Sequence, residues 1–139
     1  MSLIIREATA EDVEIFNDFG VKDQEINDVL ESETDWAFLV FDDSKTVAYA
    51  CCEGYGEEMT LFMEFHSYDS TLPEYGKAII NYMLDFAKQK GFKRITVDTD
   101  NDEDVAIYDL CTQYPDVEVE DNEVFLTVIF DLDVVEPID

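Results

Sequence analysis

The sequence predicts one mixed α/β domain over residues 1–139, with a sheet of about seven strands flanked by about four helices. The length fits a single domain, and 47% hydrophobic residues are enough for a conventional core. Runs rich in β-branched and aromatic residues mark the strands. Segments whose apolar residues recur at helical spacing interrupt these runs, which indicates that strands and helices share one core.

The N-terminal segment is expected to form a strand and two helices. Residues 3–6 (Leu-Ile-Ile-Arg) are a short strand. Thr9 and Asp12 have the spacing of a capping box, which predicts a helix from there to about Phe19. A second helix is expected over residues 23–30, because three of its apolar residues share one face. These residues are Ile26, Val29 and Leu30.

After the second helix, the spacing of the apolar residues changes from that of a helix to that of a strand. Residues 36–41 and 46–52 are β-rich runs separated by the turn-forming residues 42–45 (Asp-Asp-Ser-Lys). A third strand over residues 59–66 completes an antiparallel N-terminal meander. Alternation places two sets of its side chains on opposite faces. One set is Leu61, Met63 and Phe65, and the other is Thr60, Phe62, Glu64 and His66.

The next helix is expected over residues 76–90, where apolar residues recur at helical spacing up to a stop at Gly91. A helical crossover makes the following strand, 94–98, parallel to 59–66 and gives the sheet a parallel central pair. An acidic turn follows, and then a further helix and two strands. Their expected bounds are 98–102 for the turn, 104–111 for the helix, and 117–120 and 124–132 for the strands. The acidic tail, 133–139, is expected to be frayed.

The charge balance narrows the choice of partners. Thirty-five Asp and Glu against eight Lys and Arg give a formal charge of −27. Such a chain repels nucleic acid and anionic membrane surfaces, and no cluster of basic residues offers a local exception. Its field attracts cations such as polyamines, aminoglycosides or the basic segment of another protein. A repulsive surface, adaptation to salt, and an acidic mimic of nucleic acid remain alternative interpretations of the charge.

Cysteine usage and hydropathy predict a cytoplasmic protein. Cys51, Cys52 and Cys111 form no CxxC pair, and their odd number makes a disulfide framework unexpected, so they are interpreted as small core residues. No apolar run reaches the length of about 20 residues that spans a bilayer. The first residues also lack the basic and apolar regions of a signal peptide.

The element order and several short motifs resemble the Gcn5-related N-acetyltransferase (GNAT) superfamily across nearly the whole chain. The segment from Gly76 to Gly91 resembles the family's helix between its last pyrophosphate-loop glycine and the glycine before the next strand. Residues 99–108 resemble the family's Asn-x-x-Ala-x-x-x-Tyr region, with Asn101 and Ala106 spaced more widely. Residues 4–8 (Ile-Ile-Arg-Glu-Ala), followed by a Thr-capped acidic helix, resemble its opening. The resemblance implies a GNAT-like fold and acetyl-coenzyme A as cosubstrate.

The resemblance also implies where the cosubstrate binds. The family's phosphate loop, Gln/Arg-x-x-Gly-x-Gly/Ala, falls on residues 71–76 (Thr-Leu-Pro-Glu-Tyr-Gly), which retain only its final glycine. Glu74 adds bulk and negative charge there, and the nearby basic side chain of Lys77 partly compensates for that charge. An alternative register treats residues 73–77 as a shortened motif, but it makes the helix about one turn too short. The implied cofactor-binding residues are Phe65, His66, Ser67, Thr71, Glu74, Tyr75, Gly76, Lys77 and Asn101.

Two side chains are implied as catalytic. An alkyl amine is protonated at neutral pH and must lose a proton before it attacks, so Glu64 is the expected general base, directly or through water. Tyr108 occupies the place of the family's tyrosine, which protonates the departing thiolate. The backbone of Phe65, His66 and Ser67 would polarise the thioester carbonyl. His66 is a weaker candidate for a base or relay.

The sequence supports no other catalytic constellation. A lone histidine with scattered thiols makes no zinc site, and no nucleophile elbow or phosphate-binding P-loop is present. The acidic turn lacks the glycine and the glutamate of a calcium loop, so no metal is expected. Two functions remain. One is an N-acetyltransferase acting on a primary amine of a cationic small molecule or peptide. The other is a catalytically weakened GNAT-like protein that binds a basic partner, and a homodimer is left open.

Overall fold

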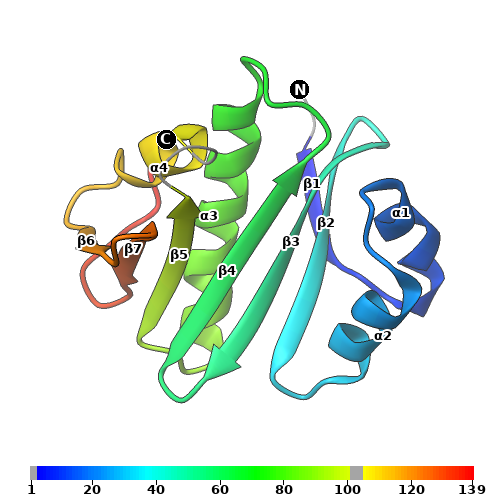
Figure 1. The fold of residues 1–139 in the computed structure, drawn as a ribbon, viewed down its shortest axis with the longest axis horizontal. Coiled ribbons are helices and arrows are strands. Elements are labelled where there is room, and N and C mark those ends of the chain that lie inside the picture. Colours follow the sequence, from blue (N-terminus) through cyan, green and yellow to red (C-terminus); the bar gives the residue numbers. More distant parts are fainter. Residues whose placement is uncertain (1–2, 101–104) are drawn as a thin grey trace.

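The computed structural model describes residues 3–100 and 105–139, and its strands form a single mixed sheet (Figure 1). The strands are β1 (Leu3–Glu7), β2 (Asp35–Asp42), β3 (Lys45–Tyr55), β4 (Glu58–Phe65), β5 (Arg94–Asp100), β6 (Glu118–Asp121) and β7 (Phe125–Asp131). The helices are the 3-10 turn η1 (Ala10–Asp12), α1 (Val13–Asp18), α2 (Asp23–Glu31), α3 (Leu72–Gln89) and α4 (Val105–Cys111). None of these described helices is long and apolar enough to cross a membrane.

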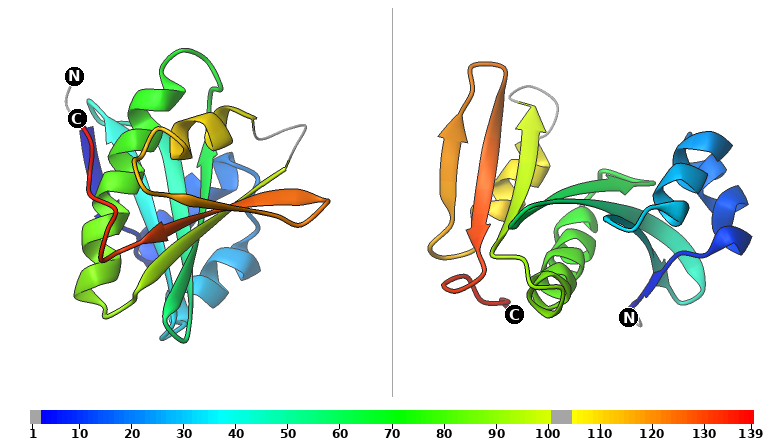
Figure 2. Two further views of the ribbon diagram at one scale, coloured as in Figure 1. Left: turned by 90° about the vertical axis from the view of Figure 1, so that its left-hand side faces the viewer. Right: turned by 90° about the horizontal axis from the view of Figure 1, so that it is seen from below.

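The sheet has the order β1-β2-β3-β4-β5-β7-β6. Its first four strands form an antiparallel meander, β4 and β5 run parallel, and β5, β7 and β6 are antiparallel again. The expected mixed sheet with a parallel central pair is therefore confirmed. Figure 2 shows α3 and α4 on one face of the sheet, while α1 and α2 cover the other face only at its β2–β3 side.

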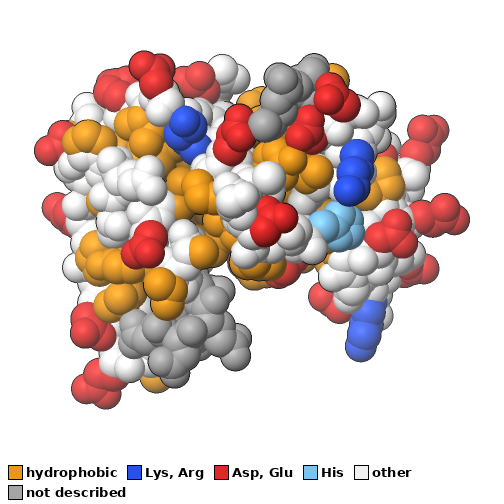
Figure 3. Space-filling view, turned by 90° about the horizontal axis from the view of Figure 1, so that it is seen from above, with side chains coloured by type: hydrophobic (Ala, Val, Ile, Leu, Met, Phe, Trp, Pro, Cys, Tyr) orange, Lys and Arg blue, Asp and Glu red, His pale blue; other side chains and the backbone are white. Residues whose placement is uncertain are grey.

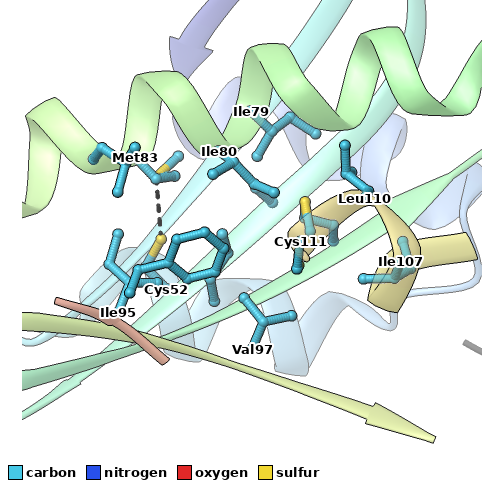
Figure 4. Close-up of a cluster of buried hydrophobic side chains, with 14 of the residues drawn as sticks. Cys52, Ile79, Ile80, Met83, Ile95, Val97, Ile107, Leu110 and Cys111 are labelled. Atoms are coloured by element: carbon cyan, nitrogen blue, oxygen red, sulfur yellow. Dashed lines mark hydrogen bonds between the residues drawn. The ribbon is translucent and has the colours of Figure 1, made fainter. Parts of the chain in front are cut away.

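The larger core lies between α3, α4 and the sheet (Figure 4). The expected apolar face of the helix is buried there, where Ile79 and Ile80 approach Ile107 and Leu110 of α4. The thiol of Cys52 lies 3.5 Å from the sulfur of Met83. All three cysteines are free thiols, and burial raises the pKa of Cys111 to about 12.

The start of the first helical segment is joined to β1 by one ion pair. Arg6 donates from both terminal nitrogens to the two carboxylate oxygens of Asp12, at 2.8 and 2.9 Å. The backbone N–H of Thr9 donates to the same carboxylate at 2.8 Å, as the predicted capping box requires. Asp12 is buried, and these bonds, led by that from Arg6, lower its pKa to about 2.

The tail is not frayed as the sequence predicted. Val135 is fully buried in the larger core. The side-chain amide of Asn81 donates to the carbonyl of Ile138 at 2.7 Å, and its oxygen accepts from the N–H of Ile138 at 3.1 Å. Tyr114 donates to the same oxygen at 2.8 Å. The buried Val135 and the side-chain amide of Asn81 on α3 therefore hold residues 133–139 in place, although their acidic composition predicted exposure.

Replacing Asp12 by Asn should lower the free energy of unfolding by about 1 to 2 kcal/mol at pH 7. The folded pKa lies below the ordinary carboxyl value of 3.8, so the stabilisation is complete above pH 4 and disappears as the pH falls towards 2. Urea titrations of both proteins across this range measure the difference. Glu11→Gln, an exposed neighbour, is the control, and a pH-independent difference would contradict the ion-pair explanation.

Replacing Val135 by Ala should cost about 2 kcal/mol, because two buried methyl groups are lost and a cavity remains. Val134, whose side chain is 49% exposed, provides the matched control. Val134→Ala should change stability by less than about 0.5 kcal/mol. Equal effects of the two substitutions in urea unfolding would mean that the tail does not close the core.

Candidate active site

The site begins where the parallel strands β4 and β5 separate. Their register covers only three residue pairs, from Glu58 with Arg94 to Thr60 with Thr96. Beyond these pairs β4 continues to Phe65 against β3, and β5 continues to Asp100 against β7. Figure 1 shows the two strands side by side at one end and apart at the other, where α3 begins. The separation leaves backbone groups on the facing strand edges without a strand partner.

Alternation of the antiparallel ladder identifies the backbone groups of β4 that face this gap. The N–H of His66 donates to the carbonyl of Val47 on β3 at 3.0 Å. In such a ladder every second residue bonds to the same neighbour, so the backbone groups of Met63 and Phe65 point away from β3 and towards the gap. Of the three backbone segments expected to line the gap, Phe65 therefore has the right orientation, whereas the N–H of His66 is engaged by β3.

One face of the sheet is left uncovered beside the gap. This open face consists of Thr60, Phe62 and Glu64 of β4, Thr96 and Asp98 of β5, and Thr127 and Ile129 of β7, which cross-strand register places on the side away from α3. The Phe62 ring is 52% exposed. Thr60 and Thr96 bring their hydroxyl oxygens within 3.3 Å across the last parallel pair, and Thr127 donates to Asp98 at 2.7 Å.

Glu64 stands half-buried on this open face. Tyr68, four residues further along, donates its hydroxyl to one Glu64 carboxylate oxygen at 2.8 Å. Across the strand Glu64 pairs with Tyr49, which is buried against α1. Burial raises the pKa of Tyr49 well above its ordinary value, and the nearby charge of Glu64 adds to the effect. Glu64 therefore has one oxygen fixed by a phenol and a neutral neighbour across the strand.

His66 marks one wall of the site. Its ring stacks on Phe19 at the end of α1, with centroids 3.7 Å apart and planes 12° from parallel. Figure 3 looks onto this end of the molecule and shows the pale-blue histidine exposed at its surface. Carboxylates are spread over the same view, with few basic side chains among them. The stacked position gives His66 an anchoring role for the end of α1.

Tyr108, the other predicted catalytic residue, is on the opposite side of the sheet from Glu64. It lies in α4 and is half-buried against the larger core, on the α3 side, whereas Glu64 stands on the open face. The two predicted catalytic side chains are therefore on opposite faces, and the gap between β4 and β5 is the opening between those faces. Asn101, the other residue expected here, lies outside the described residues.

The expected phosphate loop differs most from the structure. Helix α3 begins at Leu72, four residues before the predicted start at Gly76, so residues 72–76 are helical. Asp69 organises this start. Its carboxylate accepts the N–H of Thr71 at 2.9 Å and the Thr71 hydroxyl at 2.6 Å, and Ser67 adds a further hydrogen bond. These bonds, with the Thr71 hydroxyl foremost, lower the pKa of Asp69 to about 2.

The remaining backbone groups of the first turn are also engaged. The N–H of Leu72 donates to the Asp69 carbonyl, and those of Glu74 and Tyr75 donate to the Thr71 carbonyl, all at 3.2 Å. Pro73, between them, has no N–H. Every backbone N–H from residue 71 to residue 75 thus has an acceptor within the protein, which leaves none directed at an external anion.

Three other expected cofactor residues have structural partners. A methyl group built on Gly76 would lie 2.2 Å from the side chain of Leu110, so this glycine permits α3 and α4 to approach closely. Tyr75 donates its hydroxyl to Asp42 at 2.7 Å, towards the end of β2. Lys77 is half-buried, and its carbonyl accepts the hydroxyl of Tyr114 at 3.3 Å. Packing accounts for Gly76 and Tyr75 without a cofactor.

The site therefore fits one part of acetyl-coenzyme A better than another. Unpaired backbone groups of β4 at the gap suit an extended arm that carries amides and a thioester. The start of α3 does not suit a diphosphate, because its N–H groups are engaged and Asp69 and Glu74 carry negative charge there. The residues present fit the thioester end of the cosubstrate and do not fit its diphosphate.

Sequence reasoning missed Tyr68 and Asp69. Nothing in the pattern around Tyr68 indicates a contact with Glu64. Asp69 had a signal, because an Asp two residues before a Thr, followed by a Pro at the second helical position, is typical of a helix start. Aligning Gly76 with the last glycine of a phosphate loop placed the start one turn too late.

No protein-family model matches this sequence, and no curated protein is significantly similar to it. Solved structures of N-acetyltransferases do match its fold. The PaiA N-acetyltransferase of Thermoplasma acidophilum, in complex with coenzyme A, superposes with a TM-score of 0.78 and 13% identity over 94% of this chain and 99% of that one. An N-acetyltransferase of Staphylococcus aureus Mu50 gives 0.77 and 13% over 95% and 99%.

A third solved structure is a spermidine N-acetyltransferase chimera from Vibrio cholerae and hSSAT. It matches with a TM-score of 0.73 and 10% identity, over 96% of this chain and 97% of that one. At these identities the likeness concerns the fold, and it extends over nearly the whole chain. The order of elements, the parallel central pair and the solved neighbours agree: the chain has the fold of the GNAT N-acetyltransferases.

Proposed function

We propose that this protein is an N-acetyltransferase that moves the acetyl group of acetyl-coenzyme A to a primary amine of a cationic small molecule or peptide. The observation that carries the proposal is the gap between β4 and β5, which opens beside a half-buried carboxylate, Glu64, on the open face. The fold neighbours support acetyl transfer. One of them is in complex with coenzyme A and another is a spermidine N-acetyltransferase.

The open face supports a cationic acceptor. Besides Glu64 and Asp98, the register places four more carboxylates on the same side of β4, β6 and β7. Among the described residues of β4 to β7, it places one basic residue on that side, Arg94 of β5. The four carboxylates are Glu58, Glu118, Glu120 and Asp131. With a formal charge of −27 on the chain, this field concentrates cations at the face. The exposed ring of Phe62 offers a surface for an alkylammonium group.

The proposed chemistry uses one side chain on each face of the sheet. Glu64 accepts a proton from the ammonium group, directly or through water, and so frees the lone pair that attacks. The donor supplies a thioester, whose C–S bond breaks as the C–N bond forms. Tyr108 gives its proton to the departing sulfur, and the second proton lost by the new amide nitrogen restores the Tyr108 hydroxyl through solvent, while Glu64 releases its proton to solvent. The backbone at Phe65 and Ser67 polarises the thioester carbonyl.

The alternative is a catalytically weakened protein that binds a basic partner through the same acidic face. The engaged start of α3 favours this alternative, because the usual anchor for a diphosphate is missing. The two functions differ in what they do with the amine. The enzyme consumes thioester in its presence, whereas the binding protein retains the amine or basic peptide unchanged.

Thiol release from acetyl-coenzyme A should be stimulated by a primary amine from a panel of spermidine, an aminoglycoside and a lysine-containing peptide. Glu64→Gln and Tyr108→Phe should each lower the turnover number by about 100-fold, because each removes a proton-transfer group. The thermal midpoints of both variants should stay close to that of the parent protein, since neither substitution removes buried volume.

Glu58→Gln and Tyr82→Phe are the matched controls. Glu58 lies on the same face of β4 as Glu64, at the end far from the start of α3, where it accepts a hydrogen bond from Arg94 at 2.9 Å. Tyr82 lies in the middle of α3. Both variants should retain parental turnover. Thiol release that no amine stimulates, with retention of the basic peptide on the immobilised protein, would favour the binding protein instead. Unchanged turnover in both site variants would remove the proposed roles.

A further inference from the structure

We propose that the acyl donor is recognised through its pantetheine arm alone, and that the start of α3 excludes the diphosphate of the donor. Acyl-pantetheine thioesters are then substrates of the same kind as acyl-coenzyme A. The inference rests on the proposed function for its catalytic part, but its binding part is independent of turnover.

Asp69 occupies the position that an external anion would take at the start of α3. Its carboxylate accepts the N–H and the hydroxyl of Thr71, at 2.9 and 2.6 Å, and a hydrogen bond from Ser67. These are the kinds of donor that a phosphate takes at a helix start. A phosphate group cannot share them, since its oxygens would approach those of an ionised carboxylate.

The rest of the first turn of α3 offers a phosphate no other donor. Pro73 has no N–H, and the N–H groups of Leu72, Glu74 and Tyr75 have acceptors within the turn. Glu74 is exposed and adds a second negative charge to this turn. Gly76, the one residue kept from the family's loop, serves the contact with Leu110. The negative charge of this turn, its lack of free N–H donors and the close contact between Gly76 and Leu110 thus all disfavour a diphosphate here.

The free backbone edge of β4 can still bind the pantetheine arm of the donor. The pantetheine arm is uncharged and carries two amides, so it is not repelled by a chain of charge −27. The β4 edge beyond Thr60 offers the backbone groups of Met63 and Phe65 in the spacing of a strand. An extended amide chain that pairs with such an edge gains hydrogen bonds without needing a basic residue.

Calorimetric titration of the intact protein with three probes tests the proposal. The probes are pantetheine, coenzyme A and adenosine 3′,5′-bisphosphate, which represents the nucleotide part. Pantetheine and coenzyme A should bind with dissociation constants within about threefold of each other, because the nucleotide part adds no favourable contact. Adenosine 3′,5′-bisphosphate should give no heat of binding. Coenzyme A binding more than about 100-fold tighter than pantetheine would overturn the proposal.

Variants locate the effect. Asp69→Ala should tighten coenzyme A by about tenfold and leave pantetheine unchanged, because it frees the Thr71 N–H and removes one like charge. Glu74→Gly should act in the same direction. Asp85→Ala removes one carboxylate from the exposed middle of α3 and controls for net charge. If Asp69→Ala loosens the helix start, Asp69→Asn keeps an acceptor and should still favour coenzyme A. No gain in either Asp69 variant would overturn the proposal.

The outcomes separate this inference from the proposed function. Tight, nucleotide-dependent binding of coenzyme A with amine-stimulated turnover would leave the enzyme and overturn the inference. Equal binding of pantetheine and coenzyme A without turnover on any amine would support the inference and count against the enzyme. Failure of both thiols to bind would overturn both.

Discussion

The separation of β4 from β5 after Thr60 and Thr96 is the constraint on which the site depends. β4 stays with the antiparallel meander and β5 stays with β7, so each strand keeps one complete ladder while the ladder between them ends. The buried face of α3 packs beneath this opening, with Ile79 and Ile80 against α4. The backbone edge of β4 and the position of Glu64 beside it both follow from this one break in pairing.

Charge and backbone geometry place opposite demands on the two ends of the site. The open face gathers carboxylates around Phe62, which suits a cation. A donor with a diphosphate must approach the same negative field. Asp69 and Glu74 at the start of α3 strengthen that field where the fold family needs an anion site. A protein of this charge therefore attracts a cation more easily than a polyanion.

The sequence was sufficient for the fold and for part of the site. The spacing of apolar residues located all seven strands and the larger core. Elements such as β4 and α3 are buried on one face, so their apolar residues recur at a regular interval. The start of α3 was placed wrongly, since the motif alignment outweighed the helix-start signal of Asp69 and Pro73. The order of the tail depends on the burial of Val135 and on one amide, Asn81, which bonds to Ile138 57 residues away. Contacts of that separation leave no local pattern.

The hydrogen bonds between Asn81 and Ile138 also have a consequence for the order of folding. The meander and α3 consist of residues that are contiguous up to Gln89, but the larger core to which α3 belongs also contains Val135 and is incomplete until that residue is in place. β7 must likewise enter between β5 and β6 before that half of the sheet is continuous. A nascent chain whose residue 135 has not yet left the ribosome therefore has an incomplete core. The protein completes its fold only when nearly all of the described residues have been released.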